Sequence, residues 1–248
     1  MAHPVAYGVN RAETGTITVG GSAANRPATR LYDRFSVPVW TDTASGTRNI
    51  DLDKGNTTES IDAVCGIGHN LGGITCTVYH DDNAGFASST VLGSVVPAAG
   101  TPFRVTGTGS TERYWRFSMA STTAAPQIGE LFFTVGVVFP YGPADTDLHR
   151  GRVANVVKHE TESGIVIAFK KGETRWQSTF TIADINDGAD RTAFETLFDN
   201  LDGGAKPFFY LDEDGTVLRW VEWVNPEVIA SAKPLTSDVS LLFREALG

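Results

Sequence analysis

The sequence predicts a mainly β protein, in which an N-terminal β-sandwich is followed by a second β module with one short α-helix. Three observations support this prediction. The 248 residues include 26 glycines and 11 prolines, which is typical of chains with many turns. Short runs of alternating polarity recur between breaks rich in Gly, Asn and Asp, as expected for strands. A helical period stands out over residues 189–201.

The first 143 residues contain an arm and the predicted sandwich. Residues 1–30 are rich in Gly, Ala and Thr, and their one alternating run, Thr14 to Val19, indicates an extended arm or first strand. Residues 31–143 alternate short strands with turns, and this spacing predicts a sandwich of the jelly-roll type. The strands are expected at residues 47–52, 60–68, 74–80, 91–96, 104–106, 114–119 and 129–139.

Residues 144–248 form the second predicted module. The turn-prone segment 141–145, Tyr-Gly-Pro-Ala-Asp, is the best linker candidate and places the boundary at residue 143. The helix is expected at about 189–201 because its apolar residues recur at i, i+3, i+4 and i+7. A helix with one apolar face must lie against a sheet, so the module is predicted to be a barrel or sandwich plugged or covered by this helix. Strands are expected at residues 153–157, 164–170, 176–182, 207–211, 217–224 and 237–244.

The ends of the predicted helix carry their own signals. Asp187 or Asp190 can accept hydrogen bonds from the free amides of the first turn. The Gly203-Gly204 pair can adopt the left-handed conformation that ends a helix. The apolar stripe between these ends consists of Phe194, Leu197, Phe198 and Leu201.

Composition excludes several classes of protein. The formal net charge of −9 argues against a nucleic-acid partner, which would require clustered Lys and Arg. The N-terminus lacks the pattern of a secretory signal, and no apolar run reaches the length of a membrane span, so no membrane insertion is expected. Cys65 and Cys76 are expected to be buried thiols, although a bridge between them stays possible.

No pattern of residues indicates catalysis or a bound cofactor. The chain has no Gly-x-Ser-x-Gly motif, and the carboxylates Glu160 and Glu162 lie on a predicted loop. His69 follows Gly68 and precedes Asn70, so we interpret it as a turn histidine bonded to the loop backbone rather than as a base or ligand. The chain is therefore predicted to be no enzyme, with no catalytic residue and no cofactor.

Two acidic segments leave calcium binding open. Residues 51–59, with Asp51, Asp53, Asn56 and Glu59, offer several oxygen ligands, and so do residues 81–83. Neither segment follows the spacing of the helix–loop–helix calcium motif, and polar turns have the same composition. No metal site is predicted.

The first half resembles the galactose-binding-like, or discoidin-type, β-sandwich. The resemblance covers about residues 30–140 and rests on Leu31-Tyr32-Asp33, on Val39-Trp40 and on the segment from Ile61 to Leu71, which ends in Gly-His-Asn-Leu. The closing strands around Tyr114-Trp115-Arg116 and Leu131-Phe132-Phe133 also match. This resemblance implies a carbohydrate-binding module as one possible role.

The second half is similar to tail-tube and distal tail proteins of tailed phages. The similarity rests on the run from Arg175 to Phe180, the helix, the run from Lys206 to Tyr210, Arg219-Trp220 and the alternating run from Val239 to Glu245. It implies a structural tail-tip protein in which copies close a ring, a hexamer, that joins the tail tube to other tail-tip proteins. Such a protein is assembled in the host cytoplasm and resides in the virion. The order of the two modules is the reverse of that in distal tail proteins.

Two sets of aromatic residues are candidate contact sites. Tyr32, Tyr79 and Phe86 are expected near the sandwich loops, where aromatic faces can stack on a host glycan, although packing in the core is the more common role of aromatic residues in a sandwich. Trp40, Trp115 and Trp176 are assigned to the core.

The second set belongs to the second module. Trp220 and Trp223 are three positions apart and must point to opposite faces of a strand, so one of them is expected to be exposed or at a subunit interface. Phe208, Phe209 and Tyr210 need cover on both faces for the same reason, and packing between subunits is predicted to supply it. The leading hypothesis is the tail-tip structural protein, and the alternative is a carbohydrate-binding module that contacts host polysaccharide.

Overall fold

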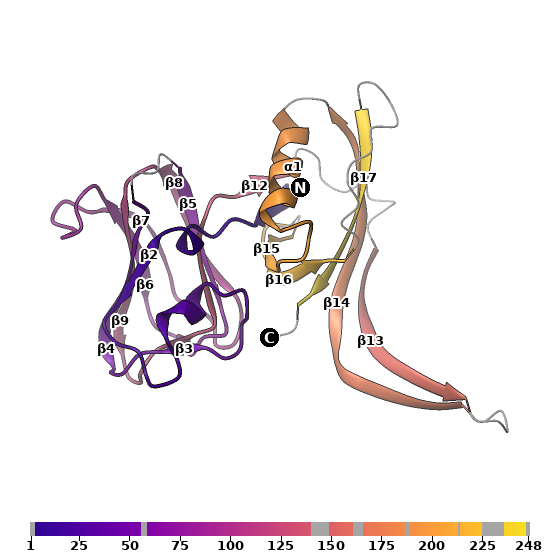
Figure 1. Ribbon diagram of the computed structural model, residues 1–248, viewed down its shortest axis with the longest axis horizontal. Coiled ribbons are helices and arrows are strands. Elements are labelled where there is room, and N and C mark those ends of the chain that lie inside the picture. The colour runs from indigo at the N-terminus through magenta and orange to yellow at the C-terminus, as the bar shows by residue number, and fades with distance from the viewer. Residues whose placement is uncertain are drawn as a thin grey trace.

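The computed structural model describes residues 3–55, 59–139, 149–160, 166–186, 189–212, 214–224 and 236–246. For residues 149–151, 153–160, 166–173, 180–186, 189–191 and 236–240 the description covers the backbone only. The protein is mainly β, with a sandwich, a second sheet and one α-helix in the described residues, as predicted (Figure 1).

The sandwich consists of a five-stranded and a three-stranded antiparallel sheet. The larger sheet has the order β2 (Thr16–Val19), β4 (Gly46–Asp53), β9 (Tyr114–Thr122), β6 (Cys76–Asp81) and β7 (Thr90–Val95). The smaller sheet has the order β11 (Glu130–Thr134), β5 (Ile61–Ile67) and β8 (Phe103–Ser110), and β10 (Gln127–Ile128) pairs with β3 (Trp40–Thr41). Trp115 and Phe117 are fully buried while their neighbour Arg116 points outwards, because successive side chains of a strand face opposite sides.

The second sheet is a single open sheet of seven strands rather than a closed barrel. Its order is β12 (Val137–Val138), β1 (Val5–Tyr7), β15 (Phe208–Leu211), β16 (Leu218–Trp223), β17 (Thr236–Glu245), β14 (Val166–Asn186) and β13 (His149–Glu160). The sheet therefore takes strands from both halves of the sequence. Residues 1–30, predicted to be an arm or first strand, contribute β1 to this sheet and β2 to the sandwich.

The helix α1 (Ala189–Asn200) confirms the predicted helix almost residue for residue. Phe194, Leu197 and Leu201 are buried against the second sheet, as their spacing requires. Gly203 and Gly204 both have positive φ and end the helix as predicted. The proposed N-cap Asp187 lies outside the described residues, and so do the linker 141–145 and the boundary at residue 143.

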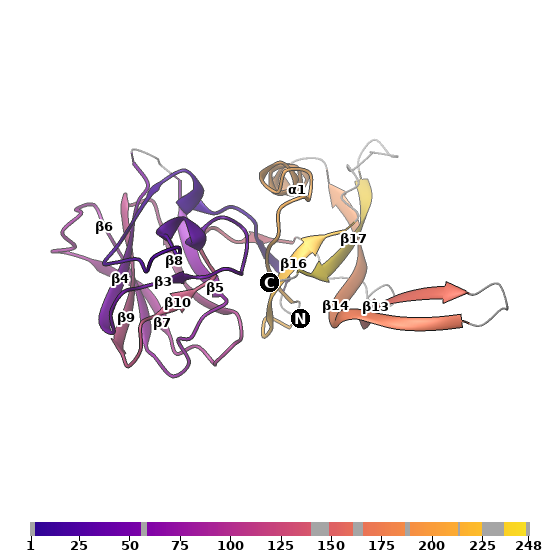
Figure 2. The same cartoon turned by 60° about the horizontal axis from the view of Figure 1, so that its bottom comes forward.

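Both faces of β15 and β16, in the second sheet, are covered within the chain. Phe208 and Tyr210 of β15 pack with the helix, whereas Phe209 and Leu211 of the same strand pack on the three-stranded sheet of the sandwich. This alternation is the pleat of a strand that lies between two apolar layers. Side chains of the sandwich and of the second sheet form one buried cluster where the two parts lie side by side, and Figure 2 shows this arrangement of the two parts.

Two of the predicted strand divisions differ from the structure. The strand expected at 129–139 is divided into β11 and β12, which belong to two different sheets. Conversely, the strands expected at 164–170 and 176–182 are one strand, β14, of 21 residues. The pairing partners of these segments, rather than their own sequence, set where each strand begins and ends.

The strands β13 and β14 form a hairpin that projects from the body of the protein (Figures 1 and 2). β14 pairs with β17 only from Gln177 onwards, so its residues 166–176 have β13 as their only strand partner in the described part of the chain. No helix among the described residues is long and apolar enough to span a membrane.

Candidate functional site

A row of side chains crosses the outer face of the five-stranded sheet. The strand register places Asp51 of β4 beside Arg116 of β9, and Arg116 beside Tyr79 of β6. Thr18 of β2 extends the row on one side and Val91 of β7 on the other. Asp51, Arg116 and Tyr79 each lie between two buried residues of their strand, so the hydrophobic pattern that builds the sheet also aligns the centre of this row.

Arg116 and Asp51 form the centre of the row. The Nε and Nη2 groups of Arg116 donate to the two carboxylate oxygens of Asp51, each at 2.7 Å. This two-point contact with Asp51 raises the pKa of Arg116. Two residues after Asp51 on the same strand, Asp53 accepts from Arg113 in the same two-point manner, at 2.7 and 2.8 Å. Both pairs hold rigid charged groups on the face without adding net charge.

Phe86 reaches this row from the loop between β6 and β7. The Arg116 guanidinium lies 4.1 Å from the centre of the Phe86 ring. Phe86 has a φ of 52°, a left-handed conformation that is uncommon for a bulky residue. Strained positions of this kind persist where the surrounding structure holds them. The loop must therefore supply that support.

Asp81 supplies much of the support for the Phe86 loop. One oxygen of its carboxylate accepts from the amide of Asn83 at 3.0 Å, and the other accepts from the amide of Ser88 at 3.1 Å. Bonds from these backbone amides, with that of Asn83 first, lower the pKa of Asp81. Asn83 in turn accepts from the amides of Gly85 and Phe86. The loop presents Phe86 in one defined position.

A shallow groove continues from Asp51 away from Phe86. It has a volume of about 270 Å³ and is lined by polar side chains of β2 and β4, among them Thr18, Asn49 and Arg48. Arg48 is itself paired with Asp42, at 2.7 and 3.0 Å. The groove and the neighbouring rings of Tyr79 and Phe86 together present aromatic faces, hydrogen-bond donors and hydrogen-bond acceptors on one surface. That combination suits a polyhydroxylated ligand.

The structure brings together two of the three predicted sugar-contact residues. Tyr79 and Phe86 both lie beside Arg116, whereas Tyr32 follows the short helix η2 (Ala28–Leu31) and packs against the sandwich core. Sequence reasoning missed Arg116 as a site residue and considered Asp51 only as a calcium ligand. The alternation of polar Asp51 and Arg116 with apolar neighbours was the signal that could have indicated them.

The five predicted interface residues are buried inside the chain. Phe208, Phe209, Tyr210, Trp220 and Trp223 each have at most 4% of their surface exposed. The prediction that one tryptophan is exposed or at a subunit interface is wrong, because the helix covers Trp223 and the sandwich covers Trp220. The prediction that they face opposite sides of the strand is confirmed.

The remaining sequence predictions concern residues away from the sheet face. His69 accepts from the Leu71 amide through Nδ1 and contacts the Thr101 carbonyl through Nε2 at 2.8 Å, which confirms the turn histidine. Cys65 and Cys76 are free and buried, and burial raises the pKa of Cys76 to about 12. Trp40 and Trp115 are buried in the core, and Trp176 is partly buried.

The acidic segments considered for calcium are engaged otherwise. Asp51 and Asp53 are paired with arginines, and Asp81 accepts bonds from its own loop. Within the described residues, no group of three or more His, Cys, Asp or Glu side chains is arranged to hold a metal ion.

Comparisons with known proteins give likeness of fold only. No family model and no curated protein matches the chain. Among solved structures, a chitosan-binding module of a Paenibacillus sp. IK-5 chitosanase/glucanase is 20% identical, covers 50% of this chain and 96% of its own, and has a TM-score of 0.42. CBM62 from Clostridium thermocellum Xyl5A is 19% identical, with 50% and 96% coverage and a TM-score of 0.41.

A third similar structure belongs to an enzyme. A Ruminococcus gnavus GH29 fucosidase in complex with fucose is 17% identical, with 53% of this chain and 28% of that chain covered and a TM-score of 0.45. The neighbours are mostly carbohydrate-binding modules with a galactose-binding-like sandwich. At these identities and scores the likeness says nothing about the ligand of this chain, and none of the three is a phage tail protein.

Proposed function

We propose that this chain is a non-enzymatic carbohydrate-binding protein whose sandwich holds a neutral saccharide chain on its five-stranded face. The observation that carries the proposal is the preorganised cluster of Phe86, Arg116, Asp51 and Tyr79. An aromatic ring can stack on the apolar face of a sugar, and the rigid Arg–Asp pair can exchange hydrogen bonds with neighbouring hydroxyl groups.

The charge balance favours a neutral ligand. The arginines of this face are matched by carboxylates in the pairs Arg116–Asp51 and Arg113–Asp53. A charged sugar would have to compete with one member of a pair, whereas hydroxyl groups can use the lone pairs and N–H groups that the pairs leave over. Preorganisation by the Asp81-supported loop lowers the entropy lost on binding.

Calorimetric titration with neutral hexasaccharides of the chito-, galacto- and xylo- series tests the proposal. We expect saturable binding of at least one series, weakened about tenfold, or ~1.4 kcal/mol, by Phe86→Ala. Val96→Ala, which truncates an exposed apolar side chain outside the cluster, serves as the matched control and should bind as the parent does. Equal affinities of the parent and Phe86→Ala would refute this site.

The projecting hairpin supports a second candidate function, which is structural assembly. A two-stranded ribbon is marginally stable in water on its own, and residues 166–176 of β14 have an edge with no strand partner in the described part of the chain. In this reading, copies of the chain pair through their hairpins and form a closed ring in the virion tail tip of a phage, as the resemblance to tail proteins implies. Both roles can coexist, with the sandwich turned towards host glycan.

A shortened hairpin tests the assembly role. Ala154 and Thr174 face each other in register, so residues 155–173 can be replaced by an Asn-Gly turn that keeps the rest of the sheet. Light scattering over a range of concentrations should show a defined oligomer for the parent and a monomer for the shortened chain. An identical mass for the two proteins at every concentration would exclude hairpin-driven assembly.

A further inference from the structure

A second, separate groove runs along the junction between the sandwich and the second sheet. It consists of a hollow of about 840 Å³ and one of about 440 Å³, which share Arg175 and Ala246 as lining residues. The larger hollow lies between the sandwich loop at Thr101 and the start of β16, and the smaller lies beside Phe35. The two meet where β17 ends, so together they offer an extended path.

The charge of this groove differs from that of the protein as a whole. Its lining holds four basic and three acidic side chains, whereas the chain carries a net charge of −9. The basic side chains are Arg34, Arg175, Lys206 and Arg219, and the acidic ones are Asp33, Glu222 and Glu245. Arg34 is also paired with Glu13 and Lys206 with Asp202, so the attraction of the groove for anions depends mainly on Arg175.

Arg175 is the residue best placed to meet an anion. Its side chain borders both hollows, and its contact from Nη1 to Glu222 is long at 3.4 Å. The same Glu222 oxygen is contacted more closely by Arg244, at 2.8 Å. Arg175 can therefore turn towards a ligand while Glu222 keeps its stronger partner. A planar guanidinium fits a carboxylate in a two-point contact.

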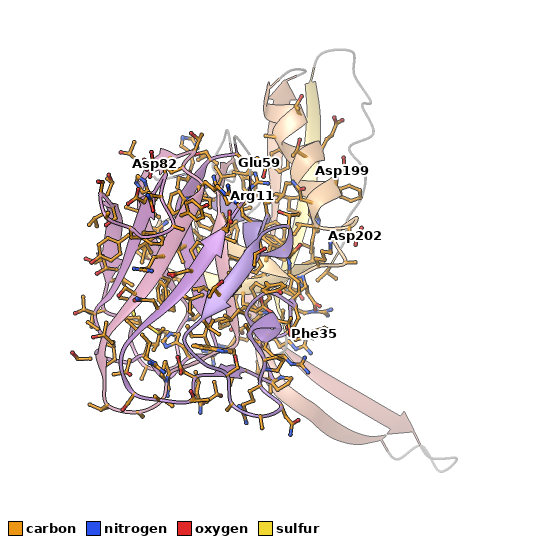
Figure 3. The ribbon with its side chains drawn as sticks, turned by 60° about the vertical axis from the view of Figure 1, so that its left-hand side comes forward. Arg11, Phe35, Glu59, Asp82, Asp199 and Asp202 are labelled. Carbon is orange, nitrogen blue, oxygen red and sulfur yellow. The ribbon has the colours of Figure 1, made fainter. Side chains whose placement is uncertain are left out.

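Phe35 provides an aromatic face at the other end of the groove. Its side chain is 64% exposed, the highest value among the large hydrophobic residues described. Figure 3 shows it at the end of the sandwich that borders the second module. The adjacent Arg34 donates to the carbonyls of Gly8 and Pro207, at 3.0 and 2.8 Å, and the Phe35 amide donates to Asp33. The exposed ring thus stands on an anchored loop.

We infer that this groove binds an anionic saccharide, with Arg175 contacting a carboxylate of the sugar and Phe35 stacking on a sugar face. The inference rests on the proposed carbohydrate-binding function and adds a second subsite with a different preference. On the sheet face the arginines are held in two-point pairs, whereas in the groove Arg34 and Lys206 have carboxylate partners of their own and Arg175 is the loosely held cation. An exposed aromatic ring beside hydrogen-bonding groups favours a sugar over a simple inorganic anion.

Oligogalacturonate and its methyl ester are the probes that test the groove. They share one sugar backbone and differ in charge, so the contrast isolates the contribution of the carboxylates. With the full-length chain we expect the acid to bind at least tenfold more tightly than the ester, with an affinity that falls as salt is raised. Arg175→Gln should abolish the preference for the acid, and Phe35→Ala should weaken binding of the acid about tenfold.

Variants of the sheet face and of the loop serve as controls. Phe86→Ala should leave oligogalacturonate binding unchanged while it weakens neutral sugars, and Phe35→Ala should do the reverse, so failure of one site is distinguishable from failure of the other. Val37→Ala, at an exposed apolar residue of the same loop that does not line the groove, should bind as the parent does.

Three results would overturn the inference. Equal binding of acid and ester would remove the role of charge, and an unchanged affinity in Arg175→Gln would remove the proposed anchor. Tight binding of poly-L-glutamate that Phe35→Ala leaves unaltered would show that the groove takes acidic chains without regard to sugar. Retained helix and strand content in circular dichroism confirms that each variant is folded.

Discussion

The ring of Phe132, from the sandwich strand β11, meets the ring of Phe209, from β15 of the second sheet, edge to face with centroids 5.1 Å apart. Phe132 also contacts Trp220 at 5.5 Å and the guanidinium of Arg34 at 4.5 Å. It is fully buried. These contacts place one aromatic side chain at the centre of the joint between the two modules.

Phe132→Ala is expected to destabilise both modules together. Removal of a fully buried phenylalanine typically costs about 3–5 kcal/mol, and this side chain belongs to the contact that both sheets share. Denaturant unfolding should show a single transition at lower denaturant. Phe35→Ala, at an exposed position, should stay within about 0.5 kcal/mol of the parent. Two separate transitions, of which only one moves, would show that the modules fold independently.

Glu130→Gln is expected to remove a pH dependence of stability. The carboxyl of Glu130 is completely buried, and burial together with the nearby Asp33 raises its pKa to about 10, from an ordinary value of 4.5. The folded state holds this proton where the unfolded state has lost it, so stability should decline as pH rises from about 4.5 towards 10. The decline should be shallower in Glu130→Gln, measured by denaturant unfolding at pH 5, 7 and 9. Asp199→Asn, at an exposed carboxylate, should retain the slope of the parent.

His69→Asn should make the protein less sensitive to mild acid. Burial lowers the pKa of His69, which is only partly offset by the carbonyl of Thr101. The folded state thus favours the neutral ring, and its contribution to stability is present above about pH 6.5 and is lost as pH falls below that value. An asparagine oxygen can still accept from the Leu71 amide. Thermal unfolding at pH 7 and pH 5 should show a smaller drop for the variant; an equal drop would contradict the assigned role.

Asp81→Ala is expected to weaken saccharide binding without contacting the saccharide. The substitution removes the acceptor for the amides of Asn83 and Ser88, which frees the loop that positions Phe86. A more mobile Phe86 loses more conformational entropy when the saccharide binds. We therefore expect the affinity for the saccharide to fall about tenfold, or ~1.4 kcal/mol. The same neutral hexasaccharides provide the measurement. Unchanged affinity in Asp81→Ala would show that loop order is irrelevant to binding.

The sequence predicted local structure well because local structure follows from periodicity. The helix, its apolar stripe and its glycine stop were all visible in the pattern, and so was the opposite facing of Trp220 and Trp223. The sequence did not show what covers those faces. Apolar residues on both faces of a strand indicate that each face packs against another layer. They do not indicate whether that layer belongs to the same chain or to another copy.

The candidate site shows the same division. Alternation placed Tyr79 on one face of its strand, but the partner strand and its register brought Arg116 alongside, and a loop with one residue at positive φ brought Phe86 over it. Tyr32 is also an aromatic residue that was expected near the sandwich loops, but it packs against the core. The pairing of strands, which sequence patterns do not specify, decided which aromatic residues meet.

Composition and periodicity were enough to predict the β content, the helix, the buried thiols and the overall acidity, since each depends on the residues of one segment or on their sum. Long-range contacts, in contrast, pair β1 with β15, bring Arg34 to the carbonyl of Pro207 across 173 residues, and place Phe35 and Arg175 at one groove. Contacts of that separation depend on long-range packing and strand register. The energies of long-range packing and strand pairing are shared among many residues, so no local sequence pattern predicts them.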